Sequence, residues 1–333
     1  MNLKEKLQSA YQKIKEADKV LIVGHILPDA DALASVSAMM RVSETLGSSV
    51  YAYTKEKISG AYRFIPHEER ILDEHPISLS SFSVILTLDC GSIERTGLEK
   101  EIKELLLKPE GERPCVIEFD HHPSPPTPSY ADIEVRLPEK ASTTEIIYHF
   151  LKANHLEITK ELADCILIGL MTDTGNFFHA NSSKEALAIS SEMLLLGASM
   201  PRIINHTVYN KNFTSLKVWG RVLENMVFNA DTGLVVSALT QKEIDELLSE
   251  EQNGQADLFG DIVSFLNSLS GVSVALLLRE KDGDVKGSLR TNSDTINVAK
   301  IAQGYGGGGH KKAAGFRVKG RLERTRTGWN IKR

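Results

Sequence analysis

Histidine and aspartate side chains cluster directly after apolar runs of this sequence, where they can bind divalent metal ions. Asp89 follows the apolar run 85–88, and open α/β sheets place their ligands at such strand ends. The segments "GHILPDAD", "FDHH" and "MTDTGNF" carry the same residue types, so the full candidate set is His25, Asp29, Asp31, Asp89, Asp120, His121, His122 and Asp173. Oxygen and imidazole ligands favour Mn²⁺, with Mg²⁺ as the second choice, over the cysteine-rich settings of structural zinc.

These candidate ligands are too many for one ion. Two ions about 3.5–4 Å apart, bridged by one carboxylate, would use the whole set, and such pairs promote in-line displacement at phosphorus. Taken singly, each acid also fits a helix or turn cap, and each histidine also fits a hydrogen-bonded core or surface position. The joint pattern H-x-x-x-D-x-D followed by D-H-H therefore carries the prediction of a dinuclear site.

The same segments resemble the motifs of a known enzyme family. "GHILPDADALAS", "LDCGS", "DHHPS" and "TDTGNFFHANSS" resemble, in order, the four motifs of the DHH phosphoesterases. "SLRT" (288–291) and "GGGGHKKAAGF" (306–316) resemble that family's DHH-associated C-terminal domain, so the resemblance covers nearly the whole chain. In size and layout the sequence is most similar to the nanoRNase and pAp-phosphatase type. Cys90 and the Leu33-Ala34 pair depart from the family pattern, and neither removes a ligand.

The resemblance implies a role for each candidate ligand. It gives two ligand sets that share a bridging carboxylate: His25, Asp29 and Asp89 for the first ion, and Asp31, Asp89, His121 and Asp173 for the second. Asp120 and His122 are assigned to the catalytic centre. Asp120 would orient an imidazole, as metal-binding histidines usually require, and His122 would face either a metal or the leaving group. The two ions would activate a water for attack at phosphorus.

A glycine-rich segment near the C-terminus is predicted to bind phosphate. We expect "QGYGGGGHKKAAGF" (303–316) to form a loop and then a helix, so that N–H groups of Gly307, Gly308 and Gly309 approach an anion beside a helix N-terminus. His310 stands where a Walker-type loop has its lysine. A flexible loop, and a surface position for Arg290, are the alternatives. The family resemblance favours Arg290 and His310 as phosphate ligands, since arginine offers a bidentate fork.

Two further features bear on nucleic-acid binding. Residues 311–333 carry nine Lys and Arg residues and one acid, Glu323, which fits either a solvated tail or a basic rim that attracts polyanions. Phe177, Phe178 and Tyr305 are candidates for base stacking, although each fits a core position at least as well.

Alternating strands and helices are predicted to position these residues. Apolar runs at 19–25, 48–54, 82–89 and 113–122 alternate with helical patterns, which indicates a mainly parallel, doubly wound α/β sheet. From 142 to about 229 the pattern is helical. Later strands are expected at 233–239, 271–280 and 283–291, with helices at 241–249 and 256–269 and a hairpin turn at 282–284. We therefore expect a catalytic domain at 1–185, a helical linker at 186–214 and a smaller α/β domain with a mixed sheet at 215–333.

Composition limits the class of protein. The net charge of -5 argues against a protein that binds long duplex nucleic acid through a generally basic surface. The three cysteines have no paired spacing, which is typical of a reducing compartment. No apolar stretch approaches the ~18 residues of a membrane span, and the first residues do not resemble a signal peptide. We expect a cytoplasmic protein without a membrane partner, and the sequence leaves open whether it forms a homodimer.

The function that these observations favour is hydrolysis of phosphate esters in small nucleotides. The resemblance implies a phosphoesterase that degrades short single-stranded RNA to mononucleotides and also converts pAp to AMP and phosphate. A phosphodiesterase for cyclic or linear dinucleotides is the alternative within enzymes. A non-catalytic nucleotide-binding module is the alternative from another class, and it would be favoured if a metal ligand were missing.

Overall fold

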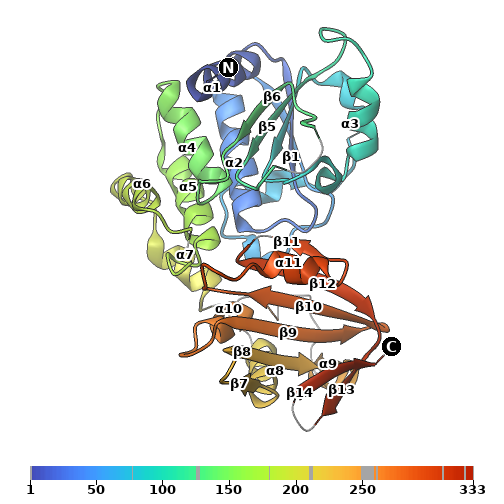
Figure 1. Cartoon of the computed structure of the whole chain (residues 1–333). Coiled ribbons are helices and arrows are strands. Elements are labelled where there is room, and N and C mark those ends of the chain that lie inside the picture. The colour runs from blue at the N-terminus through green and yellow to red at the C-terminus, as the bar shows by residue number, and fades with distance from the viewer. Residues whose placement is uncertain are drawn as a thin grey trace. The chain divides into compact units, whose positions relative to one another are not determined.

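The computed structural model describes residues 2–76, 78–124, 128–179, 181–209, 213–248, 259, 262–309, 311–325 and 328–332. The chain forms two compact units, Met1–Asn210 and Lys211–Arg333. Figure 1 labels most of their helices and strands, numbered in chain order. The first unit includes most of the segment expected as a linker. The functional boundaries 1–185, 186–214 and 215–333 stay a prediction, because compactness does not assign function.

The first unit is built on a six-stranded parallel sheet, which confirms the predicted doubly wound fold. Its strands are β1 (Lys19–Gly24), β2 (Ser49–Tyr53), β3 (Ile71–Leu72), β4 (Val84–Leu88), β5 (Cys115–Asp120) and β6 (Ile133–Arg136). They lie in the order β3-β2-β1-β4-β5-β6. The order reverses between β1 and β4, the kind of position where open α/β sheets bind their ligands. The short strands β3 and β6 were not predicted from the sequence.

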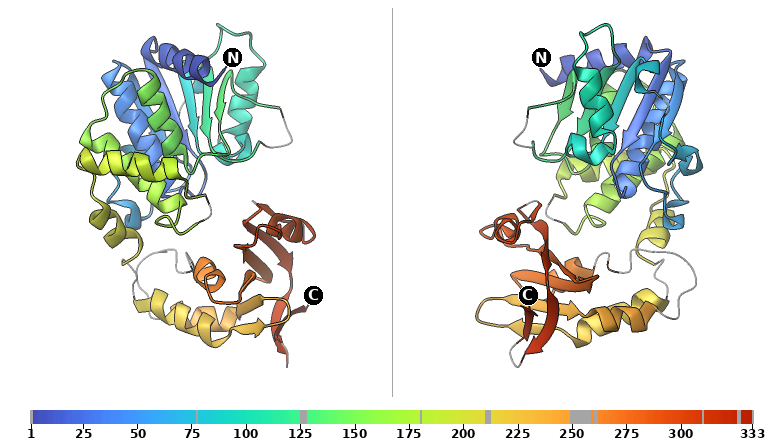
Figure 2. Two further views of the ribbon diagram at one scale, coloured as in Figure 1. Left: turned by 60° about the vertical axis from the view of Figure 1, so that its left-hand side comes forward. Right: turned by 90° about the vertical axis from the view of Figure 1, so that its right-hand side faces the viewer.

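Helices cover both faces of this sheet (Figure 2). The helices of this unit are α1 (Leu3–Lys15), α2 (Ala30–Thr45), α3 (Glu99–Leu106), α4 (Thr143–Ala153), α5 (Lys160–Asp173), α6 (Lys184–Leu195) and α7 (Met200–Thr207). Short 3₁₀ helices lie at Gly60–Tyr62, Glu68–Arg70, Leu79–Ser81 and Ile93–Thr96. Val20 and Ile22 join the core under α1, α2, α4 and α5, whereas Leu21 and Val23 join the core under α3. Side chains of β1 thus alternate between two cores, which explains its unbroken apolar sequence.

The second unit has a six-stranded mixed sheet, as predicted. The order is β11-β12-β10-β9-β8-β7, and among these neighbours only β8 and β9 run parallel. The strands are β7 (Val227–Asn229), β8 (Leu234–Leu239), β9 (Val274–Lys281), β10 (Asp284–Arg290), β11 (Gly308–Gly309) and β12 (Ala313–Lys319). Its helices are α8 (Phe213–Glu224), α9 (Gln241–Leu248), α10 (Ile262–Asn267) and α11 (Val298–Gln303). Part of the helix expected at 256–269 lies outside the described residues.

The prediction of a helix after the glycine run is wrong. The glycines follow helix α11 and lead through β11 into strand β12, which pairs with β10. A Cβ atom on Gly307 would lie 2.1 Å from the Gly315 carbonyl oxygen, so glycine is needed here because two backbones approach closely. Ala314 and Phe316 are buried in the core of the unit, which explains why this segment extends. His310 lies outside the described residues.

The basic C-terminal segment is not a free tail, although most of its basic side chains that the structure describes are exposed. Strands β13 (Arg321–Thr325) and β14 (Gly328–Lys332) form a hairpin. Leu322 is buried in a core cluster of the second unit, and the Trp329 indole donates to the Asn225 carbonyl over 3.1 Å. These contacts fix the hairpin to the unit, and a role as a basic rim stays a prediction.

The described helices include a single bent pair that resembles a membrane span. No single one is long and apolar enough to cross a bilayer, and α6 with α7, bent by 113°, would qualify as a pair by length and composition only.

Candidate metal centre

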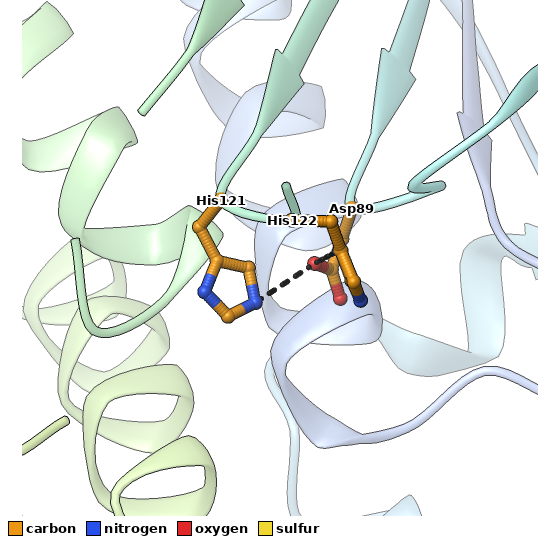
Figure 3. A group of neighbouring side chains, drawn as sticks. All are labelled: Asp89, His121 and His122. Atoms are coloured by element: carbon orange, nitrogen blue, oxygen red, sulfur yellow. Dashed lines mark ion pairs between the residues drawn. The ribbon is translucent and has the colours of Figure 1, made fainter. Parts of the chain in front are cut away.

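Three of the predicted ligands follow three neighbouring strands of the parallel sheet. His25 comes directly after β1, Asp89 after β4 and His121 after β5. Since β1, β4 and β5 are parallel neighbours, their carboxyl ends lie at one edge of the sheet. Figure 3 shows the His121 ring pointing toward the Asp89 carboxylate, with His122 close to the same group.

Helix ends bring the other predicted ligands to this edge. Asp29 is the N-cap of α2, and its side chain accepts a hydrogen bond from the Ala32 N–H over 3.1 Å. Asp31 lies in the first turn of the same helix and is fully buried. Asp173 is the last residue of α5.

The six predicted metal ligands form two groups that meet at Asp89. His25 Nε2 lies 3.7 Å from Asp29 Oδ2 and 3.7 Å from Asp89 Oδ2. On the other side, His121 Nε2 lies 3.4 Å from Asp89 Oδ1 and 3.1 Å from Asp173 Oδ2. The ligand atoms of Asp31, His121 and Asp173 lie within 4.8 Å of one another. Each oxygen of the Asp89 carboxylate therefore faces a different histidine.

The imidazole of His25 has the hydrogen-bonding state of a metal ligand. Its Nδ1 lies 2.7 Å from the Ile26 carbonyl oxygen, which can only accept, so Nδ1 carries the proton. This leaves Nε2 as the atom that can bind a metal; it is buried and has no hydrogen-bond partner within the described part of the chain. A lone pair that faces two carboxylate oxygens is stabilised by a cation between them, so these residues fit a divalent ion.

The charges of the group favour a cation as well. Burial raises the pKa of Asp31 to about 8, and the nearby Asp173 carboxylate adds to the effect. Burial also raises the pKa of Asp89 well above its usual value, with Asp31 and Asp29 as the neighbouring negative charges. Burial alone would lower the pKa of His121, but the hydrogen bond and charge of Asp173 raise it. These crowded carboxylates repel one another unless positive charge is bound among them.

Comparisons with known proteins agree with this geometry. Residues 19–170 match the DHH family, N-terminal domain, and residues 231–326 match the DHHA1 domain. The chain belongs to the DHH family. This confirms the resemblance seen in the sequence.

Relatives of this DHH protein match it over almost its whole length. The bifunctional oligoribonuclease and PAP phosphatase NrnA of Thermus thermophilus is 29% identical over 318 residues, which cover 95% of this chain and 89% of the relative. The protein of the same name from Bacillus subtilis is 22% identical, with 90% of each chain covered. An exopolyphosphatase-related protein from Bacteroides fragilis has a similar structure, with a TM-score of 0.83, 25% identity, and 94% of this chain and 90% of that chain covered.

The N-terminus of helix α4 holds two of the DHH carboxylates, a feature that the sequence interpretation missed. The Thr143 N–H donates to Asp31 Oδ2 over 2.7 Å, and the Thr144 N–H donates to Asp31 Oδ1 over 3.2 Å. The Thr143 hydroxyl also donates to Asp89 Oδ1 over 2.9 Å. The helix dipole favours negative charge at this end. The pattern Ser142-x-x-Glu145 marks the helix start, but it does not show that Thr143 contacts a residue 112 positions earlier.

Gly169 in helix α5 leaves room for the Asp31 carboxylate. A Cβ atom on Gly169 would lie 2.0 Å from Asp31 Oδ1 and 2.1 Å from Thr144 Oγ1. Helices α2, α4 and α5 therefore meet around a position without a side chain. A glycine inside a helix costs about 1 kcal/mol relative to alanine, and here close packing explains its presence.

Asp120 contacts His122 rather than the ligand groups. Its Oδ1 accepts from the His122 N–H over 2.6 Å and lies 2.9 Å from His122 Nδ1, while its Oδ2 accepts from the Gly91 N–H. Burial would raise the pKa of Asp120, but the hydrogen bond from His122 lowers it, so the carboxylate stays ionised. His122 Nδ1 also lies 3.5 Å from Asp89 Oδ1. Because Nδ1 donates to Asp120, Nε2 of His122 is left for a metal ion or for the substrate, and the choice between these two roles stays a prediction.

A buried arginine, Arg136, contacts the segment that carries Asp120 and His122. Arg136 Nη2 donates to Glu118 Oε1 over 2.7 Å, and Nη1 donates to the His122 carbonyl over 3.2 Å and lies 3.5 Å from Asp120 Oδ2. Arg136 at the end of β6 was not among the predicted site residues. No local motif marks Arg136, because its role depends on the pairing of β6 with β5.

A second group of possible ligands consists of Glu145, His149 and Glu185. Lys140 Nζ lies 2.7 Å from Glu185 Oε2 and 3.5 Å from Glu145 Oε1. The ammonium group supplies the positive charge that these carboxylates require, so this group fits an ion-pair cluster and not a metal site.

The predicted substrate ligands lie in the second unit. Arg290 ends strand β10, and its Nη1 donates to the Leu289 carbonyl over 3.2 Å. Gly307 precedes strand β11, which contains Gly308 and Gly309. Their roles, like the roles of the individual metal ligands, stay predictions.

Proposed function

We propose that this DHH protein hydrolyses short RNA oligonucleotides to mononucleotides and also converts pAp to AMP and phosphate. The observation that carries the proposal is the Asp89 carboxylate, whose two oxygens face two separate groups of His and Asp ligands. The relatives from Thermus thermophilus and Bacillus subtilis, named bifunctional oligoribonuclease and PAP phosphatase, support the choice of substrates.

The cofactors of the proposed reaction are two divalent ions, with Mn²⁺ as the first choice. His25, Asp29 and Asp89 would hold one ion, and Asp31, Asp89, His121 and Asp173 would hold the other. When bound, such ions polarise a phosphoryl oxygen and lower the pKa of a coordinated water.

The protein's own residues orient and protonate the substrate. Thr143 fixes the shared carboxylate of Asp89 through a 2.9 Å hydrogen bond, so both ligand groups keep their geometry. Asp120 holds the His122 ring by Nδ1, and we assign His122 the proton donated to the leaving oxygen. Arg290, Gly307, Gly308, Gly309 and His310 are assigned to a phosphate of the substrate that is not cleaved.

The cysteines of the chain bear on the cellular compartment that we propose for the enzyme. All three cysteines are free, and Cys90 and Cys165 are buried, which supports a reducing cytoplasm. Short single-stranded RNA, pAp and dinucleotides are the proposed partners, and a homodimer is the proposed assembly to test by light scattering.

A panel of substrates tests the proposal. The purified chain with Mn²⁺ is offered pAp, RNA of two to five nucleotides, and a cyclic dinucleotide, with Asp89→Asn as the inactive control. We expect turnover of pAp and short RNA that disappears with a chelator and returns with Mn²⁺. Turnover of the cyclic dinucleotide alone would replace the proposal by a dinucleotide phosphodiesterase, and binding without turnover would replace it by a nucleotide-binding module.

A further inference from the structure

The three aromatic residues that the sequence suggested for base stacking differ in their exposure to solvent. Phe177 packs against the main core of the first unit. Tyr305 is half exposed, and its ring stacks on Phe316 with centroids 4.7 Å apart. Phe178, by contrast, is 91% exposed. Of these three rings, Phe178 is the most exposed.

The backbone that carries Phe178 is strained. Gly175, Asn176 and Phe177 have φ angles of +56°, +57° and +68°, three consecutive residues in the left-handed region. Each such position costs of order 1–2 kcal/mol for a residue with a side chain, so a chain adopts it only when its surroundings impose it. This turn directs Phe177 into the core, and the next ring is exposed.

Hydrogen bonds within this turn connect it to the predicted metal ligand Asp173. Thr174 accepts from the Phe177 N–H at its hydroxyl over 3.0 Å and from the His179 N–H at its carbonyl over 2.8 Å. His179 Nδ1 lies 3.2 Å from the carbonyl oxygen of Asp173, the predicted metal ligand. The exposed ring therefore belongs to a hydrogen-bonded turn that directly follows the predicted metal ligand Asp173.

We propose that Phe178 is a stacking platform for a nucleobase of the substrate. The inference rests on the proposed function, because it requires a substrate with a base. An exposed aromatic ring beside the predicted metal ligands can stack on a base, and stacking accepts every base because each has a π face. Such a contact provides affinity without sequence preference, which suits an enzyme that degrades short RNA of any sequence.

Two variants and one matched control test the role of Phe178. Phe178→Ala removes the ring, Phe178→Trp keeps a ring that can stack, and Leu195→Ala removes a side chain of similar exposure (86%) at the end of α6. The full chain with Mn²⁺ is assayed on an RNA dinucleotide and on its counterpart that lacks one base. Equilibrium binding is measured with the same pair carrying a non-hydrolysable phosphoramidate link.

We expect Phe178→Ala to raise KM and Kd for the dinucleotide by roughly 5- to 150-fold, the range for one base on one aromatic ring, with kcat nearly unchanged. For the compound that lacks one base, Phe178→Ala should leave KM and Kd almost unchanged. Phe178→Trp should restore the affinity for the dinucleotide, and Leu195→Ala should bind it as the wild type does. Equal losses on both compounds, or no recovery with tryptophan, would refute stacking and leave Phe178 as a structural or protein-contact residue. If the wild type binds but does not cleave RNA, the proposed function fails, and the binding pair still decides the role of Phe178.

Discussion

Replacing Gly169 by alanine tests whether Asp31 must occupy the position where helices α2 and α5 meet. The added Cβ would lie 2.0 Å from Asp31 Oδ1, whereas ordinary contacts begin at 3.4 Å. Its other close neighbours are the Oγ1 and Cγ2 atoms of Thr144, at 2.1 Å and 2.6 Å. Asp31 is fully buried and bound to the N-terminus of α4, so it cannot move without losing those hydrogen bonds.

The expected effect on stability is small, and the effect on the site is large. Overpacking a buried position lowers the free energy of unfolding by about 1–3 kcal/mol, while alanine in place of glycine inside a helix raises it by about 1 kcal/mol. The free energy of unfolding should therefore fall by roughly 0–2 kcal/mol. The Asp31 carboxylate must shift by about 1 Å or more, and a displacement of that size lowers the rate of the catalysed reaction about 10²-fold.

The assay compares metal content, activity and stability in the same preparations. Bound Mn²⁺ is measured by mass spectrometry after dialysis, kcat/KM on pAp or a dinucleotide, and stability by urea unfolding. Gly220→Ala is the matched control, because Gly220 also lies inside a helix and nothing lies within 4 Å of its added Cβ. We expect the control to be active and more stable by up to about 1 kcal/mol.

A double variant separates the clash with Asp31 from the clash with the neighbouring threonine. Gly169→Ala combined with Thr144→Ala removes two of the three closest atoms, so stability should recover while the metal and activity stay lost. Full metal content and full activity in folded Gly169→Ala would show that Asp31 need not stay in place, and would refute its assignment as a ligand.

Three further perturbations test other parts of the structure. Asp89→Asn should reduce bound Mn²⁺ from about two ions per chain and abolish activity while circular dichroism stays unchanged; retention of both ions would exclude a bridging role. Arg290→Lys keeps the charge but not the fork, so kcat/KM on pAp should fall by about 1–3 kcal/mol, with no loss on a simple chromogenic phosphodiester and with normal metal content. Asp132→Asn should destabilise the protein by about 1–3 kcal/mol at pH 7, because Arg113 donates to both oxygens of Asp132 at 2.7 Å. Burial opposes ionisation of Asp132, yet the bonds from Arg113 hold its pKa below the usual value, so thermal unfolding of variant and wild type should converge as the pH falls below about 4.

The sequence indicated where the candidate ligands would gather, because three of them directly follow strands. A buried parallel strand is an unbroken apolar run, and the residue after it lies at the sheet edge whatever the strand order is. His25, Asp89 and His121 all follow such runs. The strand order itself could not be predicted, since it depends on contacts between segments far apart in the chain.

The contacts that hold the ligands were not predictable in the same way. Thr143 lies 112 residues from Asp31, and nothing local in "STTE" indicates that its N–H donates to that carboxylate. Gly169 looks like an ordinary helix interior position until α2 packs against α5. Short strands such as β3 and β6 were missed because pairing with a neighbour, and not their own apolar content, defines them.

The backbone at Asp89 explains how one carboxylate can face both ligand groups. Its φ is +60°, a left-handed conformation that aspartate and asparagine adopt more readily than most residues. The Asp89 N–H donates to the Phe119 carbonyl over 3.0 Å, so the β4–β5 ladder continues by one residue while the chain turns away from the strand. The side chain then lies among His25, His121 and Thr143 at the point where the strand order reverses. Asparagine tolerates the same backbone, so any loss in Asp89→Asn reports on the carboxylate charge and not on the turn.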